Sequence, residues 1–366
     1  MDGQSSGLDF ALISHMESWQ YAQDFLEAAR KSELKPLTLE QIQDSFPYFP
    51  PRKVFNITAR STFDQRVVKG AYIETFISPD ELGPRHFKKM LKKVKEAAVA
   101  AVREGAKITT LGGFTSIILE GRTYILPGSD KTAFTTGNTL TAAYVVKGME
   151  LACKMYGVDL NKSNLLILGS TGDIGTACVR YFSGKVKKML LCARNKEVLA
   201  NQHDSLTRQG LASEYSTDSG ALIPRSDLII SVASTAKPLF SLNDCLDHTL
   251  VCDAGYPKNI IAQSKQQLAR LWKGGMGQIK GGYVFEPNYS DGFYKFPAPY
   301  SGHGCLIEPL LLAMENRYES FSTKRGEITV DKIEEIWTLA KKHGCTVAPF
   351  FNMELWDRQP KTNDYG

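Results

Sequence analysis

The feature that most constrains the fold is a short apolar run that passes straight into a glycine-rich turn. Residues 164–168 read Asn-Leu-Leu-Ile-Leu, and residues 169–175 follow as Gly-Ser-Thr-Gly-Asp-Ile-Gly, opening a predicted helix that continues through Phe182. Strand, turn and helix in this order are typical of the first βα unit of a dinucleotide-binding sheet. The spacing is GxxGxxG rather than GxGxxG, so the surrounding sequence has to support the interpretation.

Repetition of the same unit gives that support. Further apolar strands are predicted at residues 189–193, 227–232 and 249–253, with helical or polar segments between them. This alternation predicts a Rossmann-type, doubly wound parallel sheet. We expect the first glycine to allow a tight turn, the second to let backbone approach a pyrophosphate, and the third to let helix pack on strand. The candidate cofactor residues of the turn are Gly169, Ser170, Thr171, Gly172, Asp173, Ile174 and Gly175.

The end of the second predicted strand indicates which dinucleotide is bound. NAD sites usually place an acidic residue there for the ribose hydroxyls, whereas this strand ends in Ala-Arg-Asn-Lys, with Arg194 and Asn195 at its tip. A cation at this position favours the 2′-phosphate of NADP, so NADPH is the predicted cofactor; a plain surface arginine is the alternative. Ala233, Gly255 and Lys258 follow later strands, and we expect them to face the nicotinamide half.

Before the Rossmann unit, the sequence predicts a smaller α/β domain. An amphipathic helix is expected at residues 19–29, neighbouring strands at 54–59 and 67–76, and a helix at 84–104. Glycine and hydroxyl residues at 111–117 and 134–139 mark points where helices begin. We predict an N-terminal substrate domain at residues 1–138, an NADP-binding domain at 139–285, and a C-terminal helical region at 286–366.

One face of the predicted helix at 84–104 is strongly basic. Such a face is either ordinary solvated surface or a docking site for an acidic protein. Its cations are Arg85, Lys88, Lys89, Lys92, Lys93 and Lys95.

Composition excludes several classes of protein. The chain has 366 residues, 43% of them apolar, which suffices for two or three packed domains. A formal charge of +5 carries no nucleic-acid signature, and no run reaches the roughly 18 apolar residues of a membrane span. Seven cysteines without a CxxC pair predict free thiols, with neither a disulfide framework nor a metal site. We therefore expect a cytoplasmic protein.

Cys305 is the one cysteine in a setting suited to catalysis. It follows Ser-Gly-His-Gly at residues 301–304 and opens an apolar helix predicted at 306–321. Glycines make the thiol accessible, a helix start stabilises a thiolate, and His303 is near enough to assist. An inert thiol beside a capped helix is the alternative. Of the other cysteines, Cys245 and Cys345 lie in polar surroundings, and the rest are predicted to be buried; these are Cys153, Cys178, Cys192 and Cys252.

Several motifs in a common order resemble the long-chain acyl-acyl-carrier-protein reductases of cyanobacterial type. The resemblance spans roughly residues 54–345 and is most specific at LGGFTSIILE, FTTGNTLTAAY and GYPKN. The matching segments are residues 70–74, 111–120, 134–144, 169–175 and 255–259, together with the surroundings of Cys305.

This resemblance implies an activity and its participants. It implies NADPH-dependent reduction of a fatty acyl thioester to an aldehyde, with Cys305 as the acylated nucleophile. Acyl carrier protein or coenzyme A would present the acyl group, and an enzyme such as aldehyde deformylating oxygenase would consume the aldehyde. Helix-start amides, Asn138 and Thr136 are candidates for stabilising an oxyanion, and His303 or Lys258 for moving protons.

Two other functions fit parts of the same sequence. A shikimate-dehydrogenase-like oxidoreductase would combine a substrate domain with a Rossmann unit and need no nucleophile. A catalytically silent NADP-binding regulator would bind the cofactor without turning over any thioester.

Overall fold

The computed structural model divides the chain into two compact units. Unit 1 comprises Met1–Gly137, Ile279–Lys324 and Leu339–Cys345, and unit 2 comprises Asn138–Gln278, Arg325–Thr338 and Thr346–Gly366. The predicted division into three domains, with boundaries after residues 138 and 285, stays a prediction. The structure describes residues 7–31, 33–81, 83, 85–119, 122–235, 238–256, 258, 260–261, 270–287 and 296–350. Glu120, Pro257 and Asn259 of the quoted motifs lie outside these ranges.

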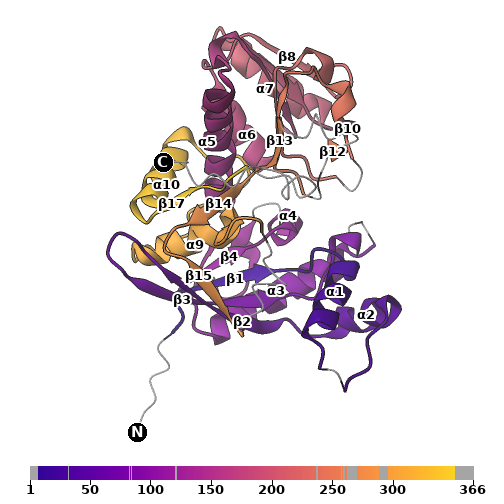
Figure 1. Ribbon diagram of the computed structural model, residues 1–366, viewed down its shortest axis with the longest axis vertical. Helices are drawn as coiled ribbons and strands as arrows, with labels where there is room; N and C mark the ends of the chain where they lie inside the picture. Colours follow the sequence, from indigo (N-terminus) through magenta and orange to yellow (C-terminus); the bar gives the residue numbers. More distant parts are fainter. Residues whose placement is uncertain are drawn as a thin grey trace. The chain divides into compact units, whose positions relative to one another are not determined.

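Unit 1 is built on a six-stranded mixed sheet in the order β15-β2-β3-β1-β4-β5 (Figure 1). Strands β3, β1, β4 and β5 run parallel, whereas β2 is antiparallel to β3 and to β15. The predicted pair of neighbouring strands is confirmed as β2 and β3. The bounds are β1 Phe10–Ser14, β2 Arg52–Arg60, β3 Val67–Glu74, β4 Ile108–Leu111, β5 Ala133–Thr135 and β15 Tyr283–Glu286.

The sequence did not reveal β1, although it lies between β3 and β4 in this sheet. Its five residues, Phe-Ala-Leu-Ile-Ser, are all buried. A strand covered on both faces shows no alternation of polar and apolar residues, so its pattern carries no period. The place of β1 in the sheet is determined by pairing with β3 and β4, which are distant in sequence.

Three predicted helices of unit 1 are present within a few residues of the predicted starts, and α2 (Leu39–Ser45) was not predicted. The amphipathic helix is α1 (Trp19–Ala29), capped by the Ser18 hydroxyl, and α2 has a capping box formed by Thr38 and Gln41. The basic helix is α3 (Phe87–Arg103), and the first glycine corner opens α4 (Phe114–Leu119). Helix α9 (Gly304–Met314) is shorter than predicted, because Asn316 takes the left-handed conformation that ends it.

One residue assigned to the basic face of α3 was placed wrongly. Lys93 is buried, and its ammonium donates to the backbone carbonyl of Phe49. Position 93 lies three residues after the buried Met90 and four before the buried Ala97, so on a 3.6-residue period its stem joins the buried side. A buried cation persists here because a carbonyl oxygen satisfies it.

Unit 2 contains a six-stranded sheet in the order β13-β11-β9-β6-β7-β8, and every pair in it is parallel. Counted from β6, this is the strand order 3-2-1-4-5-6 of the dinucleotide-binding fold, so the predicted doubly wound sheet is confirmed. The strands are β6 Asn164–Leu168, β7 Lys188–Cys192, β8 Ser213–Ser216, β9 Leu228–Ser231, β11 Leu250–Asp253 and β13 Leu271–Lys273.

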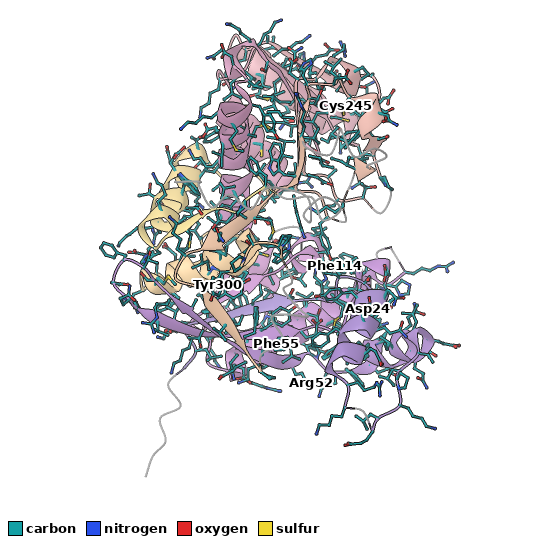
Figure 2. All side chains as sticks on the ribbon, in the orientation of Figure 1. Asp24, Arg52, Phe55, Phe114, Cys245 and Tyr300 are labelled. Carbon is teal, nitrogen blue, oxygen red and sulfur yellow. The ribbon has the colours of Figure 1, made fainter. Side chains whose placement is uncertain are left out.

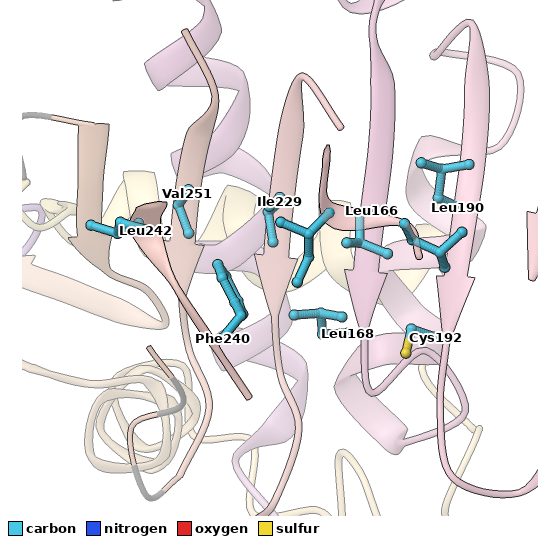
Figure 3. Packing of buried hydrophobic residues seen from close by; sticks show 10 residues of the cluster. Leu166, Leu168, Leu190, Cys192, Ile229, Phe240, Leu242 and Val251 are labelled. Atoms are coloured by element: carbon cyan, nitrogen blue, oxygen red, sulfur yellow. The ribbon is translucent and has the colours of Figure 1, made fainter. Parts of the chain in front are cut away.

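Apolar side chains of four adjacent strands form one layer on this sheet. Figure 3 shows Leu166, Leu190, Ile229 and Val251 on β6, β7, β9 and β11, with Phe240 packed against the same layer. Each of these side chains is nearly or completely inaccessible to solvent. Burial at this level contributes roughly 1.5–3 kcal/mol per large apolar side chain, so the layer holds the carboxyl ends of the strands in place.

The helices of unit 2 follow the βα order. They are α5 (Asn138–Tyr156), α6 (Asp173–Phe182) and α7 (Lys196–Arg208). Helix α10 (Val330–Lys342) begins in unit 2, and its residues from Leu339 on are assigned to unit 1. Shorter strands are found in both units, with β16 Ser301–His303 in unit 1. The others are β10 Phe240–Ser241, β12 Ile260–Ile261, β14 Met276–Ile279 and β17 Cys345–Val347. Across the described ranges, no helix combines the length and apolar character needed to cross a bilayer.

Candidate active site

The glycine turn after β6 has the geometry that a phosphate loop needs. Gly169 lies in the left-handed region, with φ of +84°, and a Cβ there would meet the backbone of Ala233 at 2.9 Å. At Gly175 a Cβ would lie 2.1 Å from the carbonyl oxygen of Gly169. Gly172 caps α6, whose first-turn amides therefore start at the turn. The turn and packing functions predicted for the first and third glycines agree with this geometry.

The same turn holds one buried hydroxyl, that of Ser170, without a hydrogen-bond partner among the described residues. Buried polar groups are nearly always paired, so an orphaned hydroxyl in such a turn calls for an external partner. Together with the helix amino end, it makes the turn a fitting site for the phosphates of a dinucleotide.

Residues from two other segments of unit 2 brace the turn. Asp173 accepts a hydrogen bond from the Asn138 side chain at 2.9 Å and from the Gly326 amide at 2.8 Å. Burial raises the pKa of Asp173, and these two bonds oppose the shift. The guanidinium of Arg325 donates twice to the Thr171 carbonyl, at 2.8 and 3.2 Å. Arg325 was not predicted, since no local pattern relates it to a turn 154 residues earlier.

Residues at the other strand ends occupy the edge that binds ligands in this fold. Arg194, after β7, is exposed and has no ion-pair partner among the described residues, while the Asn195 side chain caps α7. Ala233 lies against Gly169. The amide of Gly255 donates to the Asp253 carboxylate at 3.0 Å, and the Lys258 ammonium donates to the Asp253 carbonyl at 2.9 Å. Their roles toward a cofactor remain predictions.

Cys305 is the second residue of α9, in unit 1, rather than part of an accessible loop as the sequence suggested. It is half-buried, and burial raises the pKa of its thiol above the usual value. The backbone amides of Gly113, Cys305 and Leu306 act in the opposite direction and favour the thiolate. The predicted amide stabilisation is present, but burial outweighs it in the resting state.

The thiol's surroundings come from the carboxyl ends of β4 and β5. A Cβ on Gly137, where φ is +71°, would lie 2.5 Å from the Cα of Cys305, so the backbone after β5 runs directly against the cysteine. The hydroxyl of Thr135 donates to the fully buried carboxyl of Glu308 at 2.7 Å, one helical turn beyond Cys305. The Thr136 and Ser322 hydroxyls are hydrogen-bonded at 2.6 Å. This network holds the end of β5 beside the start of α9.

The other predicted catalytic residues are found at defined places. His303 is the N-cap of α9, and its ring packs on Phe296 with 5.6 Å between ring centroids. Asn138 lies in unit 2 and donates to Asp173, as described above. Cys153, Cys178, Cys192 and Cys252 are buried as predicted, whereas Cys345, predicted in polar surroundings, is fully buried in β17. His15, which follows the strand β1 that was not predicted, was not recognised either.

Strand order and glycine turn place the chain in the class of dinucleotide-binding oxidoreductases. Comparison with known proteins narrows the class. The chain is 31% identical over 344 residues to the long-chain acyl-[acyl-carrier-protein] reductase of Synechococcus elongatus, covering 92% of this chain and 97% of that protein. The chain therefore belongs to the family of long-chain acyl-[acyl-carrier-protein] reductases and is an oxidoreductase. Membership in this family supports the prediction of NADPH as cofactor.

Other similarities are weaker. The aminotransferase PigE of a Serratia species is 25% identical over 272 residues, which cover 72% of this chain but 30% of PigE. A dipicolinate synthase chain from Bacillus halodurans covers 70% of this chain at 9% identity, with a TM-score of 0.31 over 89% of that structure. Glutamyl-tRNA reductase from Methanopyrus kandleri covers 68% at 17% identity, with a TM-score of 0.29 over 66% of its chain. No family model matches the chain.

Proposed function

We propose that this chain uses NADPH to reduce a long-chain acyl thioester, presented by acyl carrier protein, to a fatty aldehyde through an acyl group held on Cys305. The observation that carries the proposal is the cysteine at the start of α9, with the Gly113 amide acting on its sulfur. The name of the Synechococcus relative supports the substrate class. Coenzyme A thioesters contain the same reactive group and are the alternative donor.

In the first half-reaction, the sulfur of Cys305 attacks the acyl carbonyl carbon. A carbon–sulfur bond forms, the bond to the carrier sulfur breaks, and the carrier leaves as a thiol with the proton that Cys305 gives up. One thioester replaces another, so the exchange requires little free energy. Because burial raises the Cys305 pKa, the thiol must lose its proton as the substrate binds. We assign this proton transfer to His303, two residues earlier.

In the second half-reaction, the acyl carbon on Cys305 would accept the hydride that NADPH supplies when bound. The thioester on Cys305 then becomes a thiohemiacetal oxyanion, which the amides of Gly113 and the first turn of α9 are suited to stabilise. Collapse of the oxyanion breaks the carbon–sulfur bond, releases the aldehyde and restores the thiolate. We assign Asn138 to stabilisation of the oxyanion and Lys258 to proton transfer. An aldehyde-consuming enzyme, such as aldehyde deformylating oxygenase, would take the product.

Cofactor binding is assigned to residues of unit 2. The first-turn amides of α6 and the Ser170 hydroxyl would hold the pyrophosphate, and Arg194 would pair with the 2′-phosphate. Arg325, beside Thr171, adds a second cation near the turn. Two arginines and an orphaned hydroxyl suit a cofactor with three phosphate groups.

The exposed cations of α3 support a carrier protein as the partner. We define the basic face of α3 as Lys88, Lys92 and Lys95, which border a shallow surface hollow of about 400 Å³ with Leu91 and Val99 on its floor. Lys92 has 77% of its side chain exposed. Acyl carrier proteins are strongly acidic, and complementary charge raises association rates and orients docking. The apolar floor offers contact area between the charges.

Mass spectrometry of the intact protein tests the proposal. Incubation with acyl-acyl-carrier-protein and no NADPH should add one acyl mass, and digestion should locate it on Cys305. The matched control is Cys245→Ser, since Cys245 is likewise half-buried but does not open a helix. That variant should still be acylated, whereas Cys305→Ser should not form a thioester. A silent regulator or an oxidoreductase without a nucleophile would give no adduct in any variant.

A further inference from the structure

His15 has both ring nitrogens committed, with opposite polarity. It follows β1 and is 5% exposed. Its Nδ1 lies 2.8 Å from the carbonyl oxygen of Met16, which can only accept, so Nδ1 carries the proton. The backbone amide of Phe114 donates to Nε2 at 3.0 Å, so Nε2 must be unprotonated. The two bonds together fix one neutral tautomer of the imidazole.

The same ring packs against the glycine whose amide acts on the catalytic thiol. A Cβ on Gly113 would lie 2.2 Å from His15 Nε2, so the ring sits directly on the glycine backbone. Phe114, labelled in Figure 2, also contacts the imidazole, in a T-shaped pair with 4.6 Å between ring centroids. Gly113 is left-handed, with φ of +54°. The orientation of this turn is therefore set by contacts with His15.

We infer that His15 is a positioning residue, which holds the turn at 113–114 so that the Gly113 amide points at the Cys305 sulfur. The inference rests on the proposed role of Cys305 as nucleophile. It requires the neutral imidazole, because an imidazolium would direct an N–H at the N–H of Phe114. Burial lowers the pKa of His15 to about 4, which keeps the ring neutral at physiological pH.

The effect of His15 on the thiol is geometric, not a charge effect. Among the described residues, the charged side chain that acts on the Cys305 thiol is Glu308, on its own helix, and it raises the thiol pKa. The groups that lower the pKa are the backbone amides, including that of Gly113. Moving the Gly113 amide away should therefore raise the thiol pKa without any change in nearby charge.

Two substitutions at position 15 separate the acceptor from the rest of the ring. His15→Gln places an amide oxygen near the position of Nε2 and can still accept from Phe114, whereas His15→Asn can reach the Met16 carbonyl but not Phe114. The assay is the pH profile of Cys305 alkylation by iodoacetamide, followed by peptide mass spectrometry on the full chain. His15→Asn should raise the alkylation midpoint by about one pH unit, a tenfold slower reaction at neutral pH. His15→Gln should restore the wild-type midpoint.

The control is Thr75→Val, which removes another fully buried side-chain hydrogen bond, from Thr75 to the carbonyl of Ser14. It should lower thermal stability and leave the alkylation midpoint unchanged. An unchanged midpoint in His15→Asn, or an equal shift in both position-15 variants, would overturn the inference. Loss of acylation in the wild type would instead refute the proposed function, whatever the alkylation series gives.

A measurement on the unmodified sequence covers the case in which His15→Asn does not fold. With ¹⁵N-labelled histidine, the His15 signal, assigned by its absence in His15→Gln, should show the Nδ1–H tautomer and remain neutral down to about pH 5. Titration of this signal near pH 6.5 would contradict the arrangement, because a freely protonated ring could not accept from Phe114.

Discussion

Replacing Gly137 by alanine should cost more stability than the strain of its left-handed backbone alone would cause, and it should also displace Cys305. The new Cβ would lie 2.5 Å from the Cα of Cys305, 2.8 Å from its Cβ and 2.9 Å from Cγ2 of Thr110. Two of these atoms belong to the cysteine itself, so they cannot move aside without moving the nucleophile. The left-handed φ of +71° adds its own strain.

The expected loss of stability combines two costs and one offset. A left-handed alanine costs about 1–2 kcal/mol, and overpacking of a filled site about 1–3 kcal/mol; the smaller freedom of alanine in the unfolded chain offsets about 0.4–1 kcal/mol. We therefore expect Gly137→Ala to lower the free energy of unfolding by about 1–5 kcal/mol. Displacement of Cys305 should also slow acylation at least tenfold, since misplacing a reacting group by about 1 Å has effects of that size or larger.

The control isolates backbone strain from packing. Gly210 has nearly the same φ, +73°, and a Cβ there meets nothing within 4 Å. Gly210→Ala should lower the free energy of unfolding by about 1 kcal/mol and leave acylation unchanged. Urea unfolding and the rate of acyl adduct formation are measured for both variants. Equal losses of stability, or a Gly137→Ala protein that is acylated at the wild-type rate, would refute the packing argument.

Three further predictions concern charge. Burial raises the folded-state pKa of Glu74 from 4.5 to about 8, so the folded state holds the proton more tightly, and the free energy of unfolding should fall as pH rises from 4.5 to 8. In urea unfolding, Glu74→Gln should flatten this part of the dependence of stability on pH. An unchanged dependence in this variant would contradict the assignment of the effect to Glu74. Replacing Lys88 and Lys92 by glutamate should raise KM for acyl-acyl-carrier-protein about tenfold at low salt but leave KM for acyl-coenzyme A unchanged. The control is Lys162→Glu, at an exposed lysine, which should change neither KM. Equal effects on both substrates would show that the carrier protein does not dock on this helix. Arg194→Gln should weaken NADPH binding about tenfold and leave NADH binding unchanged in calorimetric titration; a parallel loss for both nucleotides would show that Arg194 does not contact the 2′-phosphate.

Local patterns in the sequence predicted the Rossmann unit well, because each element carries its own signal. The strand before Gly169, the turn and the helix after it are contiguous, and the repeated apolar strands predicted a doubly wound parallel sheet. The order of its strands came from the structure. The glycine corners at residues 112–113 and 137 likewise coincide with helix starts at Phe114 and Asn138. Patterns confined to about 20 residues are within reach of such reasoning.

The rest depends on contacts between residues far apart in the chain. Strand β1 has no period because both faces are covered, and His15 was overlooked with it. Arg325 reaches Thr171 across 154 residues, and the Gly113 amide reaches Cys305 across a comparable interval. The inward turn of Lys93 depends on the Phe49 carbonyl. No rule of sequence spacing connects such partners, so they become visible only in the folded structure.

The most direct test of the account is a single-turnover chase. Enzyme acylated on Cys305 by acyl-acyl-carrier-protein, freed of excess substrate and mixed with NADPH, is quenched over time and analysed for adduct and aldehyde together. We predict that the Cys305 adduct disappears at the rate at which aldehyde appears, in equal amounts. Aldehyde formed by Cys305→Ala, or an adduct that persists while aldehyde accumulates, would contradict it.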